Sequence, residues 1–446
     1  MGEKTYYKLT EVQMQLLVGA FLSVEPKKGM QDNLIGFGVY VRKDFDPDAM
    51  EKAFNCLLSR NDSLRLRLSF RINGLRQSIS DYEPYVPLRR TVKNKAEFDA
   101  VIDDPQKNMP LFSEKLYRAT LVSCEDEEKS GGIYVLVHHI CCDGYSIRLM
   151  RRKLEDYYEC YVKGEEPPEE KEYSILPYFE YEEKYRKSPQ YKEDRKWWAY
   201  QYNHQPDYRF PAGRIPWRCS LDAEECETAG EPYAAFRRFC LERSYSVSSV
   251  ILHLCALSVY CLTGDTNFCL YTLTHGRMTM KLRKTIGCMI NSVPVFYQID
   301  ENDTPEEFLG KANGSYMEAL AHIRFPASKQ IMLALKETYI KRFGYNHMWF
   351  TFSSMEYDDK AEDGPFELVI PSENYLLGIF YCAFIDREEK QKMSLELSYQ
   401  ERLYSAEEAK KMLAVFNYVL DETVNGSCGT IRELREKFYR KNKEEK

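Results

Sequence analysis

The segment that runs from residue 132 to residue 161 restricts the fold more than any other part of the chain. Residues 132–140 are rich in β-branched and aromatic types and lead into Asp143 and Gly144, which predicts a strand followed by a tight turn. The hydroxyl of Ser146 can cap the first turn of a helix. One helical face then continues at spacings of three and four residues with Ile147, Met150, Leu154, Tyr157 and Tyr161. A strand, a tight turn and a helix therefore follow one another here.

Helical and strand patterns alternate along all 446 residues, and no period of about 20 to 50 residues repeats. This alternation predicts an α/β fold of the layered α+β kind and excludes solenoids and propellers. By the spacing of apolar residues, helices are expected at residues 48–58, 180–198, 247–262 and 406–420, and strands at residues 64–70, 267–274 and 393–399.

A change in composition at residues 164–171 divides the chain. The sequence there, GEEPPEEK, has two adjacent prolines between pairs of glutamates and no large apolar side chain. Such a segment neither continues a helix nor buries surface. Because the chain is long enough for two cores, we predict an N-terminal domain at residues 1–170 and a C-terminal domain at residues 171–446.

Charge and cysteine content exclude several classes of protein. The formal net charge is −7, and no Lys/Arg-rich stretch alternates with aromatic residues, so nucleic acid is not an expected partner. The first residues, MGEK, lack the apolar core of a signal peptide, so we expect the 14 cysteines to be reduced thiols of a cytoplasmic protein. No CxxC pair occurs, and we expect no metal. The longest apolar stretch, residues 247–262, is too short to cross a bilayer, and no membrane association is expected.

Two adjacent histidines, His138 and His139, end the predicted strand. Neighbouring strand residues point to opposite sides of a sheet, so one imidazole can face a cleft while the other packs inside. An imidazole within reach of an attacking amine, hydroxyl or thiol can accept its proton or stabilise developing charge, which suits acyl transfer without a covalent nucleophile. Gly144 tolerates the dihedral angles that a sharp turn after Asp143 requires.

Asp143 is expected to support this turn rather than to react. A carboxylate that is removed from water has to be paired, and arginine suits it best. We predict that Arg65 is the partner. A single histidine in a strand is usually a packed core residue, but two histidines with Asp and Gly at these offsets favour a functional site.

Residues 138–144 read HHICCDG and are followed by Tyr145 and Ser146. This run resembles, at every fixed position, the HHxxxDG motif of the condensation domains of nonribosomal peptide synthetases, which belong to the chloramphenicol acetyltransferase superfamily. Further segments are similar to family motifs: residues 60–65 (RNDSLR) to RHExLR, residues 276–277 to GR, and residues 286–294 (IGCMINSVP) to IGxFVNTLP. In residues 9–13 (LTEVQ), Thr10 and Gln13 fall on the family's SxxQ motif.

The resemblance implies two chloramphenicol-acetyltransferase-like lobes that form a V-shaped pseudo-dimer with a central tunnel. In that arrangement His139 is the active-site histidine, with His138 beside it, and Gly144 lends its backbone to the reaction centre. Arg65 pairs with Asp143, Ser146 gives structural support, and Asn291 belongs to the substrate channel. The resemblance also implies no permanently bound cofactor, because substrates arrive on the 4'-phosphopantetheine of peptidyl or acyl carrier proteins acting in trans.

The predicted function is the joining of a carrier-bound acyl thioester to an amine acceptor, with amide bond formation, in nonribosomal peptide or lipopeptide biosynthesis. The His138-His139 pair argues against the cyclization subtype, which has Asp at the first position, whereas the epimerization subtype stays open. Residues 322–326 (HIRFP) keep little of the family's HQDxPFE motif. Two alternatives stay open: a CoA-dependent or free-standing N- or O-acyltransferase with a soluble small-molecule acceptor, and a carrier-binding module without catalysis.

Overall fold

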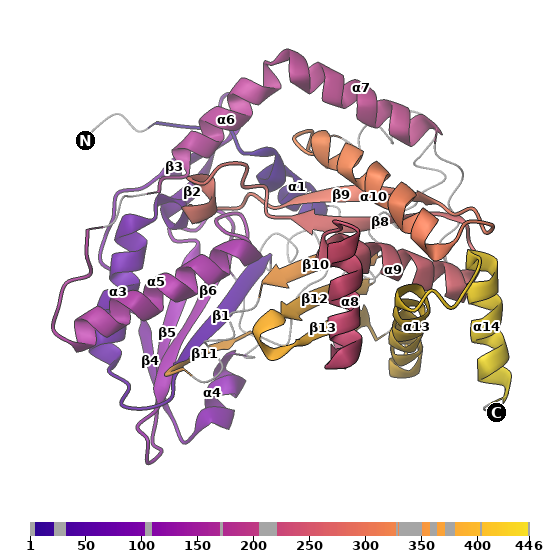
Figure 1. The fold of residues 1–446 in the computed structure, drawn as a ribbon. Helices are drawn as coiled ribbons and strands as arrows, with labels where there is room; N and C mark the ends of the chain where they lie inside the picture. Colours follow the sequence, from indigo (N-terminus) through magenta and orange to yellow (C-terminus); the bar gives the residue numbers. More distant parts are fainter. Residues whose placement is uncertain are drawn as a thin grey trace. The chain divides into compact units, whose positions relative to one another are not determined.

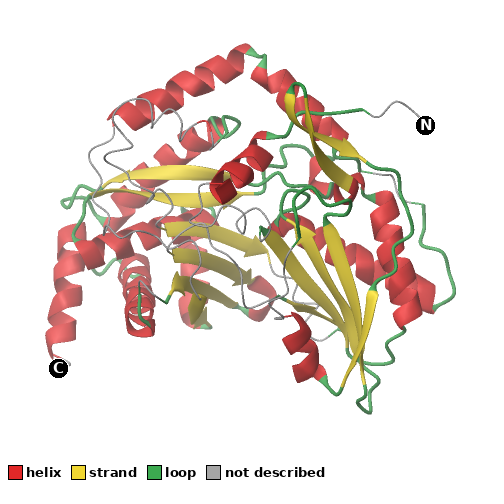
Figure 2. Ribbon diagram, turned by 180° about the vertical axis from the view of Figure 1, so that it is seen from behind, coloured by secondary structure: helices red, strands yellow, loops and turns green. Residues whose placement is uncertain are grey.

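The computed structural model describes residues 5–21, 33–102, 109–169, 173–204, 221–326, 329, 350–356, 364–370, 380–401 and 404–444 (Figures 1 and 2). The chain divides into two compact units. The first unit contains Met1–Tyr191, His275–Ile290 and Asp358–Asn374, and the second contains Lys192–Thr274, Asn291–Tyr357 and Tyr375–Lys446.

The predicted domain boundary, between residues 170 and 171, lies outside the described residues. The two compact units divide differently, because the first continues to Tyr191 and takes in two later segments. One of these segments contains β11 (Phe366–Val369), which pairs antiparallel with β1 (Leu34–Val41). A strand ladder thus joins residues about 330 positions apart in sequence, and a single boundary along the chain cannot describe this division.

The first unit is built on a five-stranded sheet in the order β11-β1-β6-β5-β4. Its remaining strands are β4 (Leu88–Val92), β5 (Tyr117–Cys124) and β6 (Gly131–His138). Three helices pack against this sheet, namely α3 (Pro47–Arg60), α4 (Lys95–Ile102) and α5 (Gly144–Val162). The strand and helix predicted on either side of Asp143 are confirmed, since α5 follows directly on the turn after β6 (Figure 1).

β6 forms the middle of this sheet, between β1 and β5. All eight of its residues are buried, as expected for a strand covered on both faces. At Gly132 a side chain is sterically excluded, because a Cβ atom would lie 2.1 Å from the carbonyl oxygen of Val39 on β1. The close pairing of β1 and β6 therefore requires glycine at this position of β6.

The first unit also contains a two-stranded sheet of β2 (Leu66–Arg71) and β3 (Gly74–Ile79), preceded by the 3-10 helix η1 (Asp62–Arg65). The predicted strand at residues 64–70 therefore begins two residues later than expected. Its other elements are α1 (Glu11–Phe21), α6 (Leu176–Arg186) and the 3-10 helix η2 (Leu282–Lys284). The helix expected at residues 180–198 is two helices, α6 and α7 (Pro189–His204), because the proline interrupts the helical pattern.

The second unit is built on a six-stranded sheet in the order β7-β13-β12-β10-β8-β9, in which β10 is parallel to β8 and β12. Its strands are β7 (Leu221–Ala229), β8 (Asn267–Thr274), β9 (Asn291–Gln298), β10 (Phe350–Glu356), β12 (Phe380–Arg387) and β13 (Lys392–Gln400). Its helices are α8 (Glu231–Glu242), α9 (Val247–Thr263), α10 (Pro305–Ala321), α13 (Ala406–Val424) and α14 (Ile431–Glu444), with the 3-10 helix η4 (Glu388–Lys390). The helices and strands predicted at residues 247–262, 267–274, 393–399 and 406–420 are confirmed.

Candidate active site

The turn after β6 carries the two adjacent histidines. His138 is the last residue of β6, is 1% exposed, and donates its backbone N–H to the carbonyl of Leu116 over 2.9 Å. His139 is the first residue of the turn, is partly exposed, and donates its N–H to the carbonyl of Asn33 over 2.8 Å. The two histidines therefore differ in kind, because the first packs inside and the second has contact with solvent.

The ring of His139 lies beside a buried thiol. Its Nδ1 atom is 3.9 Å from Sγ of Cys288, which is 3% exposed. Burial, together with the negative charge of Asp143, raises the pKa of this thiol well above its usual value. Cys288 is therefore a neutral neighbour of the imidazole at physiological pH and not a thiolate nucleophile.

Asp143 is the N-cap of α5 and lies in a complete shell of hydrogen-bond donors. Its Oδ2 atom accepts from Arg277 Nη1 over 2.9 Å and from the backbone N–H groups of Met289 and Ile290 over 2.9 and 3.1 Å. Its Oδ1 atom accepts from Arg277 Nη2 over 3.0 Å and from the N–H of Ser146 over 2.9 Å. The side chains of Asp143 and Arg277 are 1% and 0% exposed, so this is a buried bidentate ion pair.

Burial by itself raises the pKa of the Asp143 carboxyl, because it disfavours the charged form. The charge and hydrogen bonds of Arg277 and the backbone N–H groups of Met289 and Ser146 outweigh burial, and the pKa lies below its usual value. Asp143 is therefore an ionised structural group, with both oxygens engaged by protein donors.

Ser146 completes this cluster. Its hydroxyl, on a fully buried residue, accepts from Arg277 Nη2 over 2.9 Å and from the N–H of Gly287 over 3.0 Å. The same hydroxyl lies 2.9 Å from both Asp143 Oδ1 and the carbonyl of Gly287, to either of which it can donate. The start of α5 and the segment after Arg277 are thus joined through one set of buried polar groups.

Comparison with known proteins identifies the family. The model of the condensation domain matches residues 4–437. The chain belongs to the condensation domain family. The resemblance found in the sequence is therefore confirmed over nearly the whole chain.

Curated relatives of this condensation domain are nonribosomal peptide synthetases. Over 97% of its length it is 26% identical to surfactin synthase subunit 1, and over the same share it is 24% identical to one of the plipastatin synthase subunits, both of Bacillus subtilis (strain 168). It spans only 12% and 17% of those relatives. It is similar in fold to the X-domain from teicoplanin biosynthesis (TM-score 0.79, 16% identity, 97% of this chain and 98% of that one). It is also similar to the first condensation domain of the calcium-dependent antibiotic synthetase (TM-score 0.79, 17% identity, 96% and 99%), so the predicted mixed α/β fold is confirmed.

The predicted pairing of Asp143 with Arg65 is wrong. In this condensation domain Arg65 belongs to η1, and its guanidinium donates to the carbonyls of Leu58 and Ser59 in the last turn of α3 and to Ser80. Those carbonyls lack helical partners, and a nearby arginine satisfies them locally. The partner of Asp143 is Arg277 instead.

The residue that sequence reasoning missed is Arg277, although its place in the GR dipeptide was noted. Gly276 has φ 64°, and a Cβ atom there would lie 1.8 Å from the carbonyl oxygen of Met289. Only glycine permits this approach, which lets the segment from Gly276 to Met289 close on itself beside Asp143. The sequence feature that could have indicated Arg277 is the glycine directly before it, at position 276, in a segment that precedes the motif-like residues 286–294.

The turn differs from the expectation in two details. The conformational freedom of glycine is not needed at Gly144, because this residue is the first of α5, does not have positive φ, and would place a Cβ atom where nothing lies within 4 Å. The helix is capped by the side chain of Asp143 rather than by Ser146, which lies in the first turn and receives the cap through its N–H.

Asn291 is the first residue of β9 in the second unit and is partly exposed. Its Nδ2 donates to the carbonyl of Ile323 over 2.6 Å. Ile323 belongs to residues 322–326, which keep little of the HQDxPFE motif. In that segment His322 Nδ1 lies 2.8 Å from Asp194 Oδ1, and its ring stacks on Trp197 at 4.4 Å. Asn291 therefore holds a loop, and its place in a substrate channel stays a prediction.

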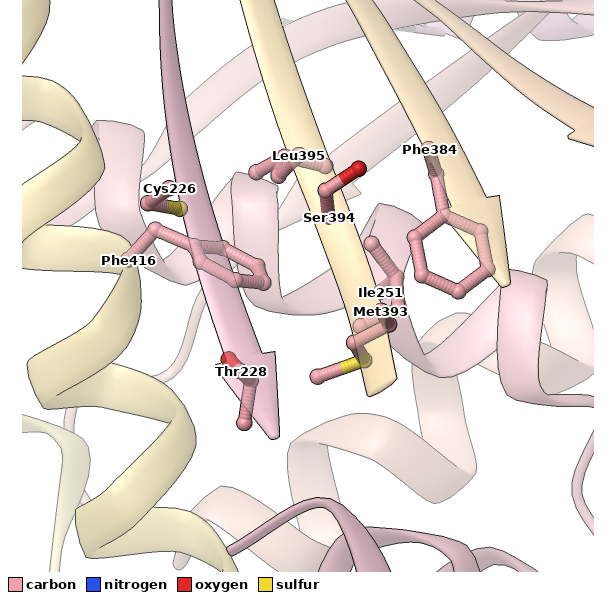
Figure 3. Close-up of a pocket in the computed structure, with 8 residues that line it drawn as sticks. All are labelled: Cys226, Thr228, Ile251, Phe384, Met393, Ser394, Leu395 and Phe416. Carbon is pink, nitrogen blue, oxygen red and sulfur yellow. The ribbon is translucent and has the colours of Figure 1, made fainter. Parts of the chain in front are cut away.

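The second unit also contains a small pocket, between its sheet and the helices α9 and α13 (Figure 3). It offers no room for a water molecule and is lined by Cys226, Thr228, Ile251, Phe384, Met393, Ser394, Leu395 and Phe416. It is a packing defect of the core rather than a binding site.

The described residues contain neither a metal-binding cluster nor a single helix that could span a membrane. Among those residues, no three His, Cys, Asp or Glu side chains lie close enough together to hold a metal ion. Nor is any single helix there both long and apolar enough to cross a membrane, while α8 and α9 reach that level only as a pair bent by 107°.

Proposed function

We propose that this chain joins a carrier-bound acyl thioester to an amine acceptor and so forms an amide bond in nonribosomal peptide or lipopeptide biosynthesis. The observation that carries the proposal is the partly exposed His139 on a turn fixed by a buried ion pair, in a chain of the condensation domain family. The curated relatives support the same kind of chemistry, since two of them are named nonribosomal peptide synthetases.

In this reaction the amine nitrogen attacks the thioester carbonyl, a C–N bond forms and the C–S bond breaks. The nitrogen loses one proton, and the leaving sulfur gains one, so the step is redox-neutral and needs no oxidant. His139 is assigned to the attacking amine, where an imidazole accepts the proton or stabilises the charged intermediate. Asp143 takes no part in proton transfer, because both its oxygens are engaged and its pKa is lowered.

His138 and Gly144 have different assignments. His138 is buried at the end of β6, and its Nδ1 accepts the N–H of Ile140 over 3.3 Å, so we assign it to holding the turn. Gly144 has open space where a side chain would lie, so we assign it to close approach of the substrate to the backbone. The donor is proposed to be carried on phosphopantetheine, with a carrier protein as partner.

The experiment compares His139→Ala with the unchanged chain. We expect product formation to fall by about a hundred- to ten-thousand-fold, because that is the usual contribution of general acid-base catalysis. Aminoacyl and fatty-acyl thioesters loaded on a carrier protein are offered with a panel of amino acids, and the amide product is measured by mass spectrometry. Thermal unfolding of His139→Ala should stay unchanged.

His138→Ala is the matched comparison, and its main effect should be a lower melting temperature. Near-normal turnover by a folded His139→Ala protein would remove His139 from the reaction. Equal losses of stability in both variants would instead give the two histidines one structural role.

A further inference from the structure

The carbonyl of Ile140, the residue directly after His139, is buried and depends on a side chain far away in sequence. Nε2 of Gln13 donates to this carbonyl over 3.1 Å, and Gln13 and Ile140 are 2% and 1% exposed. A buried carbonyl without a donor is costly, so this hydrogen bond bears directly on the conformation of the turn.

Both ends of the Gln13 carboxamide are engaged, which fixes its orientation. Its Oε1 accepts the N–H of Thr10 over 2.8 Å, and the second proton of Nε2 goes to Oε1 of Gln77 over 2.9 Å. Gln77, which is 0% exposed, donates in turn to the carbonyl of Lys8 over 2.9 Å. The two amides therefore form a closed buried network with no unused hydrogen-bonding group on Gln13.

The helix that carries Gln13 is itself anchored. The carboxylate of Glu182 on α6 accepts the N–H of Glu11, the first residue of α1, at 3.1 and 3.3 Å. Val12 and Leu16 of α1 pack with Cys288, whose sulfur is 3.9 Å from His139 Nδ1. α1 thus meets the histidine turn through the hydrogen bond to Ile140 and through Cys288.

We infer that Gln13 is a positioning residue for His139. This inference rests on the proposed function, and it assigns to Gln13 the task of holding the Ile140 carbonyl, and with it the backbone that directs the imidazole. Loss of the donor leaves the carbonyl buried and unpaired, and the turn shifts to regain a partner. A displacement of about 1 Å at a reacting group costs on the order of a hundredfold in rate.

Gln77 supplies the matched control. It is equally buried and shares the Gln13 hydrogen bond, but in the described structure it makes no hydrogen bond to the histidine turn. Gln77→Leu and Gln13→Leu each remove a buried amide of the same size, so both should lower the melting temperature by similar amounts. Only Gln13→Leu removes the donor to Ile140.

The experiment measures kcat, KM and the NMR signal of the His139 ring in the full chain, with histidines labelled at Cε1. Gln13→Leu should lower kcat at least about tenfold with KM changed less than about threefold, and should shift the His139 signal. Gln77→Leu should leave both close to those of the unchanged chain. If Gln13→Leu does not fold, Gln13→Met replaces it, because the flexible, unbranched thioether has nearly the length of glutamine but cannot donate a hydrogen bond.

An unmoved His139 signal, or equal losses of kcat in the Gln13 and Gln77 variants at equal losses of stability, overturns the inference. The NMR signal does not depend on a substrate. A chain that forms no amide product but in which Gln13→Leu alone moves the His139 ring would therefore contradict the proposed function and uphold the positioning role.

Discussion

Asp143 is a buried carboxylate at the end of the histidine turn, and the order of this turn depends on the groups that pair with it. Its pairing with Arg277 is bidentate and buried, and the same carboxylate caps α5. Removing one member of such a pair leaves an uncompensated buried charge, which costs far more than the pair itself contributes. The interaction is therefore a strict requirement for the order of the turn.

Arg277→Met and Asp143→Asn should each lower the free energy of unfolding by about 3–5 kcal/mol. Because the second change removes a partner that is already lost, the double variant should be more stable than the sum of the two losses predicts, by about 0.5–3 kcal/mol. Urea denaturation followed by circular dichroism gives these values. Arg65→Met is the control, and its effect should add to that of Asp143→Asn, because the two side chains have separate partners. Additivity for Arg277 instead would mean that the ion pair is absent in solution.

At the scale of elements, α9 shows how a buried helix accommodates a titratable group. Thirteen of its residues are buried, among them His253 at 1% exposure. The Nδ1 atom of His253 and the hydroxyl of Tyr297 on β9 are 2.9 Å apart. Burial lowers the pKa of His253 to about 3, because a charged imidazole has no access to water there.

This lowered pKa makes stability depend on pH. Between pH 6.5, the usual pKa, and about pH 3, His253 binds a proton in the unfolded chain but not in the folded chain. The stability of the fold with neutral His253 is therefore at its full value above pH 6.5 and decreases as the pH falls. From pH 7 to pH 5 the free energy of unfolding should fall by about 2 kcal/mol on this account. His253→Leu should remove that part of the pH dependence.

Tryptophan fluorescence during urea denaturation measures the effect, because Trp197 and Trp198 belong to the second unit, which also contains His253. Ser258→Ala, on the same helix, changes a buried side chain without removing a titratable group and should keep the full pH dependence. An identical pH dependence in His253→Leu would mean that other groups cause it.

At the scale of the molecule, the chain has two compact units, each with its own sheet and its own core of buried apolar residues. A chain with two full-sized units has surface for contacts far from the reacting atoms. Binding energy from remote parts of a substrate can lower the barrier of the chemical step. The proposed carrier protein is such a remote part.

One acyl group should therefore react with a kcat/KM at least about tenfold higher on a carrier protein than on CoA, and lowest on a short pantetheine thioester. The three donors are compared with one amine acceptor, and His139→Ala provides the background for each. Equal kcat/KM values for all three donors would exclude a carrier requirement and leave a thioester-dependent acyltransferase.

The sequence by itself determined the local elements and the family. The strand before His139, the helix after Asp143 and the helix over residues 247–262 all follow from the period of apolar residues, because a local period reflects which face of an element is buried. The run HHICCDG indicated the condensation domain family, because all its fixed residues lie in one short segment and can be recognised without knowledge of the tertiary structure.

Only the tertiary structure decided which distant residues meet at that turn. Arg65 and Arg277 both lie in motif-like segments, and either could have been the partner of Asp143. Arg65 is taken up by the carbonyls at the end of α3, whereas the close contact of Gly276 with the Met289 carbonyl brings Arg277 to Asp143. Arg277 lies 134 residues from Asp143 in the sequence. Gln13 and Cys288 likewise reach the histidine turn from 127 and 149 residues away. Such contacts depend on how whole elements pack, and no local period in a sequence records them.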